Sequence, residues 1–164
     1  MNKIILAAII FALGTSAGAC EIITGTVTKV ADGDTFTLKT NTKNLQIRLA
    51  RIDAPEISHF GKPAQPFGKE ASDALREMIN GEVVNVEVQN IDQYGRTVGD
   101  VRMGKDHINA IMVTDGLAWV YREYAKDAEG AGLLELESVA REKHKGLWID
   151  ANPIYPADFR KSTK

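Results

Sequence analysis

The feature that most limits how this chain can fold is a set of five short segments in which apolar and polar residues alternate. The segments are rich in Val, Ile and Thr, and turn dipeptides such as Asp32-Gly33 lie between them. The predicted strands are 22–30, 34–40, 45–52, 84–88 and 96–103. Because short strands in an open sheet leave unpaired edges, we expect the five to close into a small barrel.

Three further segments have the helical spacing of apolar residues. The predicted helices are 67–79, 107–115 and 131–145, with Asp106 as the N-cap of the second. This order of elements indicates an α+β fold, and 164 residues are enough for one domain with its own core, which Trp148 is expected to close. Segment 151–164 contains prolines and a basic end, so we expect a loose tail after a domain at 20–150.

Residues 1–19 are typical of a signal peptide. Lys3 precedes an apolar run at 4–13 that is too short to span a bilayer comfortably, and small residues at 17–19 suit a signal peptidase. We predict cleavage before Cys20 and export, so that the mature protein is periplasmic or secreted. The alternative is an uncleaved membrane anchor.

Cys20, the one cysteine in the chain, would become the first residue of the mature protein. Lipoproteins carry their lipid on a cysteine at this position, and a lipid on Cys20 would tether the protein to a membrane. Ala17 stands where such signals usually have Leu, so an unmodified Cys20 is the other alternative. With one cysteine no internal disulfide can form, and stability must come from the core.

The charge balance argues against a broad basic surface. The full chain has 20 basic and 22 acidic residues, and cleavage after residue 19 leaves 19 and 22, a net charge of −3. Such a protein has little general attraction for nucleic acid, so any phosphate binding must rest on local positive charge.

Three carboxylates are expected at one end of the hairpin formed by strands 34–40 and 45–52. If Thr40 pairs with Leu45, the predicted cross-strand pairs are Asp34 with Arg51 and Asp32 with Asp53. Carboxylates packed in this way repel one another and call for a cation. Oxygen ligands suit Ca²⁺ or Mg²⁺, and the chain has no Cys or His cluster for zinc. The simpler alternative is that Asp32-Gly33-Asp34 is only a turn.

Two arginines and a glutamate complete the candidate site. Arg48 lies on the polar face of its strand, and Arg96 follows a Tyr-Gly turn; a planar guanidinium can bind two phosphate oxygens and stabilise a charged transition state. Pro55 ends the strand and positions Glu56, which could activate or orient water. Solvent-exposed arginines and an ordinary turn are the alternatives, but the combination predicts a phosphodiester hydrolase.

Five motifs carry a resemblance to a known family. In order they are Asp32-Gly33-Asp34-Thr35, Ile47-Arg48-Leu49-Ala50-Arg51-Ile52-Asp53-Ala54-Pro55-Glu56, Asp92-Gln93-Tyr94-Gly95-Arg96, Gly116-Leu117-Ala118 and Lys145-Gly146-Leu147-Trp148. With these motifs the chain resembles the thermonuclease family, of the staphylococcal (micrococcal) nuclease type, over about residues 22–150.

The resemblance implies an OB-fold, a five-stranded barrel with three helices. It also implies Ca²⁺-dependent endonuclease cleavage of DNA and RNA that leaves 3′-phosphate ends. The residues it assigns are Arg48, Glu56 and Arg96 to catalysis; Asp34, Asp53 and the carbonyl of Ala54 to the metal; and Asp32, a near-metal acid, with Tyr94 and Tyr124, which flank the nucleotide pocket, to the substrate side.

Two rival functions remain open at this point. The same barrel serves as a non-catalytic binding module, and a phosphodiesterase for small nucleotides would also fit the low net charge. We expect a monomer that acts on single-stranded DNA and RNA, without a protein partner.

Overall fold

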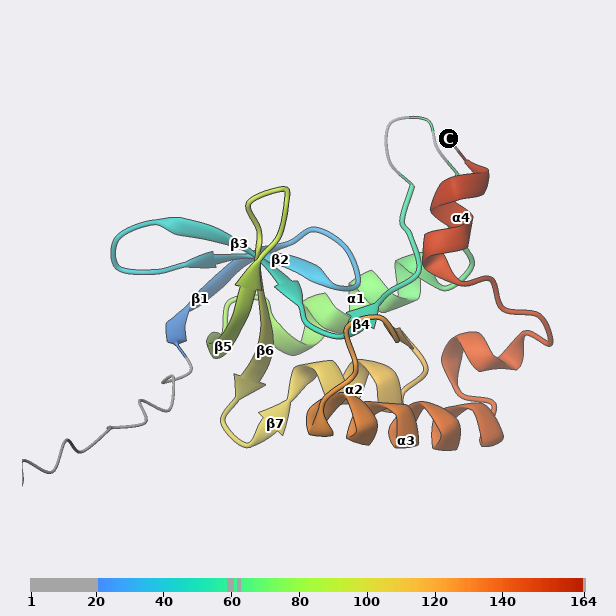
Figure 1. The fold of residues 1–164 in the computed structure, drawn as a ribbon. Coiled ribbons are helices and arrows are strands. Elements are labelled where there is room, and N and C mark those ends of the chain that lie inside the picture. Colours follow the sequence, from blue (N-terminus) through green and yellow to red (C-terminus); the bar gives the residue numbers. More distant parts are fainter. Residues whose placement is uncertain (1–20, 59–60, 62, 164) are drawn as a thin grey trace, which may run out of the picture.

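The computed structural model describes residues 21–58, 61 and 63–163, so the predicted signal peptide and Cys20 lie outside the described residues. Five strands form the barrel: β1 (Ile22–Val30), β2 (Thr35–Lys39), β3 (Asn44–Leu49), β5 (Val83–Ile91) and β6 (Thr97–Met103). Their order is β3-β2-β1-β5-β6, and parallel pairing of β3 with β6 closes the barrel (Figure 1). The predicted α+β barrel is confirmed.

The prediction of a third strand at 45–52 is wrong for the second half of that range. The chain turns after Leu49, and β4 (Ile52–Asp53) leaves the barrel to pair with β8 (Trp119–Val120). Arg51 makes the turn with a φ of 61°, a left-handed conformation that is uncommon for a residue with a side chain. Arg51 is buried and forms ion pairs with Asp100 and Asp127, which hold the turn in place.

The helices are α1 (Gly68–Ile79), α2 (Ile108–Thr114), α3 (Ala128–Glu142) and α4 (Pro156–Ser162), and a 3₁₀ turn spans Gly146–Ile149. Asp106 is not the N-cap of α2, because Asp106 and His107 form β7 and pair with the end of β6. Helix α3 begins earlier than predicted, because the side chain of Asp127 caps it by accepting a hydrogen bond from the backbone N–H of Gly130 at 2.9 Å.

The segment after residue 150 is not loose, and the prediction of three helices missed α4. Pro156 occupies the first turn of α4 and is buried, and Tyr155 just before it packs edge-on against Trp119, with 5.2 Å between ring centroids. In Figure 1 the red helix α4 stands beside the loop that leads from β4 to α1. The end of the chain therefore folds back onto the body of the domain.

Two clusters of buried side chains hold these elements together. The larger fills the barrel and extends to the inner faces of α1, α2 and α3; Phe36, Leu38 and Ile47 are fully buried in it. The smaller consists of Trp119, Ala140, Leu147 and Trp148, so Trp148 does close part of the core.

Within the described residues no helix combines the length and the apolar character that a membrane crossing requires.

Candidate active site

The hairpin of β2 and β3 has a different register from the predicted one. Thr35 lies opposite Arg48, where the predicted register would put residue 37. The predicted pairs of Asp34 with Arg51 and Asp32 with Asp53 are therefore wrong. The shift is two residues, an even number, so each side chain keeps its predicted face.

The turn explains the shift. Thr40 does not pair with Leu45, because its hydroxyl accepts a hydrogen bond from the backbone N–H of Lys43 at 3.1 Å and its own N–H donates to the Lys43 carbonyl at 2.9 Å. Side-chain bonding of this kind draws Thr40 out of the strand and into the loop.

Asp34 directly precedes β2 and is buried. One of its oxygens, Oδ2, accepts from Arg48 Nη1 at 2.5 Å and from the backbone N–H of Ala54 at 3.1 Å. The other accepts from the hydroxyl of Thr35 at 2.9 Å. Burial raises the pKa of Asp34, but the charge of Arg48 and the hydrogen bond from Ala54 outweigh it, so the pKa falls below its usual value and the carboxylate stays ionised.

Asp53 lies in β4 and is fully buried. Arg48 reaches its Oδ1 with Nη2 at 2.9 Å, so one guanidinium joins Asp34 to Asp53. Arg160 of α4 binds the same carboxylate through two parallel bonds, Nη1 to Oδ1 at 3.1 Å and Nη2 to Oδ2 at 2.9 Å. The geometry thus joins β2, β3, β4 and α4 through two arginines and two carboxylates.

Asp32 adds a third carboxylate next to Asp34. Its Oδ1 accepts from the backbone N–H of Asp34 at 3.0 Å. Burial, followed by the charge of Asp34, raises the pKa of Asp32 to about 7. Burial is the larger cause and the charge of Asp34 the smaller, so Asp32 ionises less readily than Asp34 does.

Glu56 follows β4 in the loop toward α1. Its backbone is held on both sides by Gln65: Glu56 N donates to the Gln65 side chain at 3.2 Å, and Gln65 N donates to the Glu56 carbonyl at 2.8 Å. Its carboxylate binds Arg160 Nη1 at 2.5 Å. Glu56 therefore lies beside the Asp53–Arg160 pair.

Arg96 stands on the turn between β5 and β6. Its Nε donates to Asp92 at 2.8 Å, its Nη1 lies 3.5 Å from the hydroxyl of Thr35, and its guanidinium lies 5.5 Å from the centre of the Tyr94 ring. Tyr94 and Tyr124 are exposed, and Tyr124 packs edge-on against Tyr121 with ring centroids 4.8 Å apart.

One cleft of about 1110 Å³ connects these side chains. Eight of the nine predicted site residues line it: Asp32, Asp34, Arg48, Ala54, Glu56, Tyr94, Arg96 and Tyr124. The ninth, Asp53, is buried beneath its surface. Sequence reasoning missed Arg160 and Gln65. A proline at the start of a segment with basic residues at its end was the available signal for α4, whereas nothing local marked Gln65.

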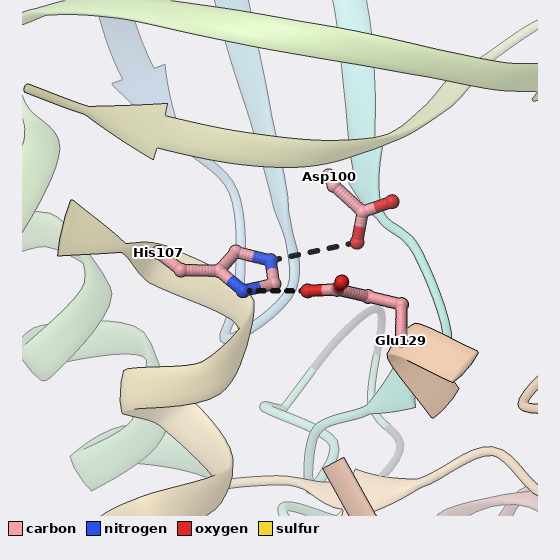
Figure 2. Close-up of side chains that lie close together, drawn as sticks. All are labelled: Asp100, His107 and Glu129. Carbon is pink, nitrogen blue, oxygen red and sulfur yellow. Dashed lines mark ion pairs between the residues drawn. The ribbon is translucent and has the colours of Figure 1, made fainter. Parts of the chain in front are cut away.

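A second cluster was also missed. In the described part of the chain, Asp100, His107 and Glu129 are the one set of three metal-ligand side chains whose ligand atoms lie within 4.8 Å of one another. Figure 2 shows each ring nitrogen of His107 facing one of the two carboxylates, with Nε2 3.5 Å from Asp100 and Nδ1 3.1 Å from Glu129. Asp100 and Glu129 also pair with Arg51 and Arg102. The two arginines thus supply positive charge to this cluster, and the cluster connects α3 to β6 and β7.

Comparisons with known proteins match the chain to one family model and to several relatives. A family model described as "Staphylococcal nuclease homologue" matches residues 46–150. The chain is 36% identical to an "Uncharacterized endonuclease" of Haemophilus influenzae, over all of this chain and 89% of that protein. It is 37% identical to a "Micrococcal nuclease" of Shigella flexneri, over 85% of this chain and 82% of that protein.

A plant relative matches as well. The chain is 40% identical to the "Staphylococcal-like nuclease CAN1" of Arabidopsis thaliana, over 74% of this chain and 35% of that longer protein. The family match covers well over half of the chain and includes Arg48, Asp53, Glu56 and Arg96. This chain therefore belongs to the family of staphylococcal nuclease homologues.

Proposed function

We propose that this protein is an exported, divalent-cation-dependent endonuclease that cleaves DNA and RNA and leaves 3′-phosphate ends. Its family makes it a nuclease, a hydrolase of phosphodiester bonds. One observation carries the proposal: Arg48, Arg96 and Glu56, which come from three separate segments, line the same cleft above a pair of buried carboxylates. A binding module would have no need of this combination of groups.

The residues present fit a divalent cation. Asp34, Asp53 and the Ala54 carbonyl would hold it, and all three offer oxygen, which Ca²⁺ and Mg²⁺ prefer. The geometry supports this fit, because Asp34 and Asp53 are both buried and one guanidinium, that of Arg48, contacts both of them. When bound, the cation would neutralise charge on the phosphate.

The chain's own groups would act on the phosphate from two sides. Arg48, fixed by Asp34 and Asp53, would bind one side of the phosphate, and Arg96, fixed by Asp92, would bind the other. Both guanidiniums are pre-oriented by carboxylates, so little reorganisation is needed as negative charge builds up. Glu56 would take a proton from the attacking water or orient that water. The exposed rings of Tyr94 and Tyr124 offer stacking surfaces for bases, which suits a substrate with unpaired bases.

The deciding experiment is digestion of heat-denatured DNA and of RNA by the mature protein, with Ca²⁺, with Mg²⁺ and with chelator. We expect cleavage that chelator abolishes, and 3′ ends that a polymerase extends only after phosphatase treatment. A dinucleotide ester as a parallel substrate tests for the small-nucleotide phosphodiesterase. No cleavage by a folded protein with either metal would favour the binding module.

Glu56→Gln should lower kcat at least about 10²-fold, because the amide keeps the shape of the side chain but cannot accept the proton of water. Circular dichroism and cation binding by calorimetry should match those of the wild type. Glu77→Gln, a change of the same kind outside the cleft, is the control and should keep full activity. Equal loss in both variants would contradict the role of Glu56.

Gly68→Ala should displace the Glu56 carboxylate indirectly, through the backbone that carries it. A Cβ at residue 68 would lie 2.1 Å from the carbonyl oxygen of Glu56, so either α1 or the Glu56 loop must move. A displacement of about 1 Å is enough to lower turnover by up to about 10²-fold. Gly132→Ala is the matched control, since nothing lies within 4 Å of its Cβ position; it should keep full activity and gain up to about 1 kcal/mol in the free energy of unfolding.

A further inference from the structure

The C-terminal helix contributes a further arginine, Arg160, to the cleft. Arg160 donates to the Asp53 carboxylate from Nη1 at 3.1 Å and from Nη2 at 2.9 Å. Its Nη1 also donates to Oε1 of Glu56 at 2.5 Å. A planar guanidinium fits a carboxylate in this two-pronged way, which a lysine ammonium cannot reproduce. One side chain thereby sets the spacing between Asp53 and Glu56.

Separate contacts hold α4 in the position from which Arg160 reaches the site. Tyr155 packs against Trp119, which pairs with Asp53 in the β4–β8 ladder. Gln65 donates from Nε2 to the carbonyl of Ile154 at 2.7 Å, while its Oε1 accepts from Glu56 N. The loop that carries Glu56 and the segment that leads into α4 are thus tied together by Gln65.

The charge of Arg160 also bears on the cation. Asp53 is fully buried, and a buried carboxylate without a counter-charge is costly, so Arg160 and Arg48 stabilise it together. A guanidinium on the Asp53 carboxylate repels a divalent cation bound to the same group. Arg160 should therefore weaken cation binding while it keeps Glu56 in place.

We infer that Arg160 is a positioning residue of the active site: it holds Glu56 at a fixed place beside Asp53, at the cost of some cation affinity. The inference rests on the proposed function. The C-terminal segment 151–163 is then needed for activity, because it carries Arg160 and holds it at the site. Removing Arg160 should lower kcat and raise the affinity for Ca²⁺, whereas removing a residue needed only for folding would lower both.

The test uses the mature full-length chain carrying Arg160→Ala, with kcat and KM on single-stranded DNA and Ca²⁺ affinity by calorimetry. We expect kcat to fall at least about tenfold with KM within about twofold, and Ca²⁺ to bind at least about threefold more tightly. Millimolar guanidinium should restore part of kcat. Arg160→Lys, which keeps the charge, should have the Ca²⁺ affinity of the wild type and an intermediate kcat.

Lys161→Ala is the matched control, because it removes a positive charge from the same helix at an exposed side chain that pairs with Asp158. This variant should change neither kcat nor Ca²⁺ affinity by more than about twofold. Unchanged kcat in Arg160→Ala, or a parallel loss of activity and Ca²⁺ binding without guanidinium rescue, would overturn the inference. If the wild type itself does not cleave, the proposed function fails, and the Ca²⁺ comparison still decides: tighter binding by Arg160→Ala supports the placement of Arg160, and equal binding overturns it.

Discussion

Arg48→Ala is expected to lower kcat on single-stranded DNA by about 10³-fold, the range found when an arginine that stabilises a transferring phosphate is removed. Arg48 is the one group that touches both Asp34 and Asp53 in the described structure, with bonds of 2.5 and 2.9 Å. Its removal takes away a phosphate donor and frees two carboxylates to move apart. Arg48→Lys should recover little, because an ammonium cannot bridge both acids.

Two controls separate this loss from unfolding. Arg102→Ala removes an arginine of β6 that pairs with Glu87 and Glu129 outside the cleft, and it should retain activity within about twofold. Urea denaturation should show that Arg48→Ala is still folded under assay conditions. A loss of less than about tenfold in a folded Arg48→Ala variant would remove Arg48 from the catalytic role.

The barrel and the cleft-facing side chains were predictable because they depend on short-range patterns. Alternation alone put Arg48 on the polar face of its strand and Ile47 in the core. The register error did not change this, since a shift of two residues leaves the faces unaltered. The predicted site residues therefore meet in one cleft, although the pairs proposed to bring them together were wrong.

What could not be predicted depends on contacts between distant residues. The turn at Arg51 is held by Asp100 and Asp127, which lie 49 and 76 residues further along the chain. Helix α4 has seven residues and no strong helical signal, and its docking rests on Tyr155 meeting Trp119. Short helices have little stability of their own, so tertiary contacts decide whether they form. Arg160 was missed for that reason.

Arg51→Ala is expected to lower the free energy of unfolding by about 3–5 kcal/mol, the cost of leaving one partner of a buried ion pair without the other. The side chains of Arg51 and Asp100 are only 8% and 4% exposed. In the variant, Asp100 would keep Gln89 at 3.0 Å and His107 at 3.5 Å, but no guanidinium. The pair with Asp127 adds less, because that side chain is half exposed.

The loss of stability at acidic pH gives a second measurement of the Arg51–Asp100 pair. Burial raises the pKa of Asp100, but hydrogen bonds from His107 and Arg51 outweigh it and lower the pKa. A lowered pKa contributes stability that is complete above the unfolded value of about 3.9 and is lost as the pH falls through the folded value. Wild-type stability should therefore drop below about pH 4, and this drop should be smaller in Arg51→Ala.

Urea denaturation at pH 7 and at pH 3.5 measures both effects, with Lys69→Ala as the control. Lys69 pairs with Asp73 on the surface of α1, and its loss should leave the free energy of unfolding nearly unchanged at either pH. Arg51→Gly distinguishes the ion pair from the backbone. Glycine accepts the φ of 61° without strain, so it should be about 1 kcal/mol more stable than Arg51→Ala while still lacking the ion pair. If Arg51→Gly were as stable as the wild type, the backbone rather than the buried pair would account for the loss, and the turn that aims Asp53 at the cleft would not depend on Asp100.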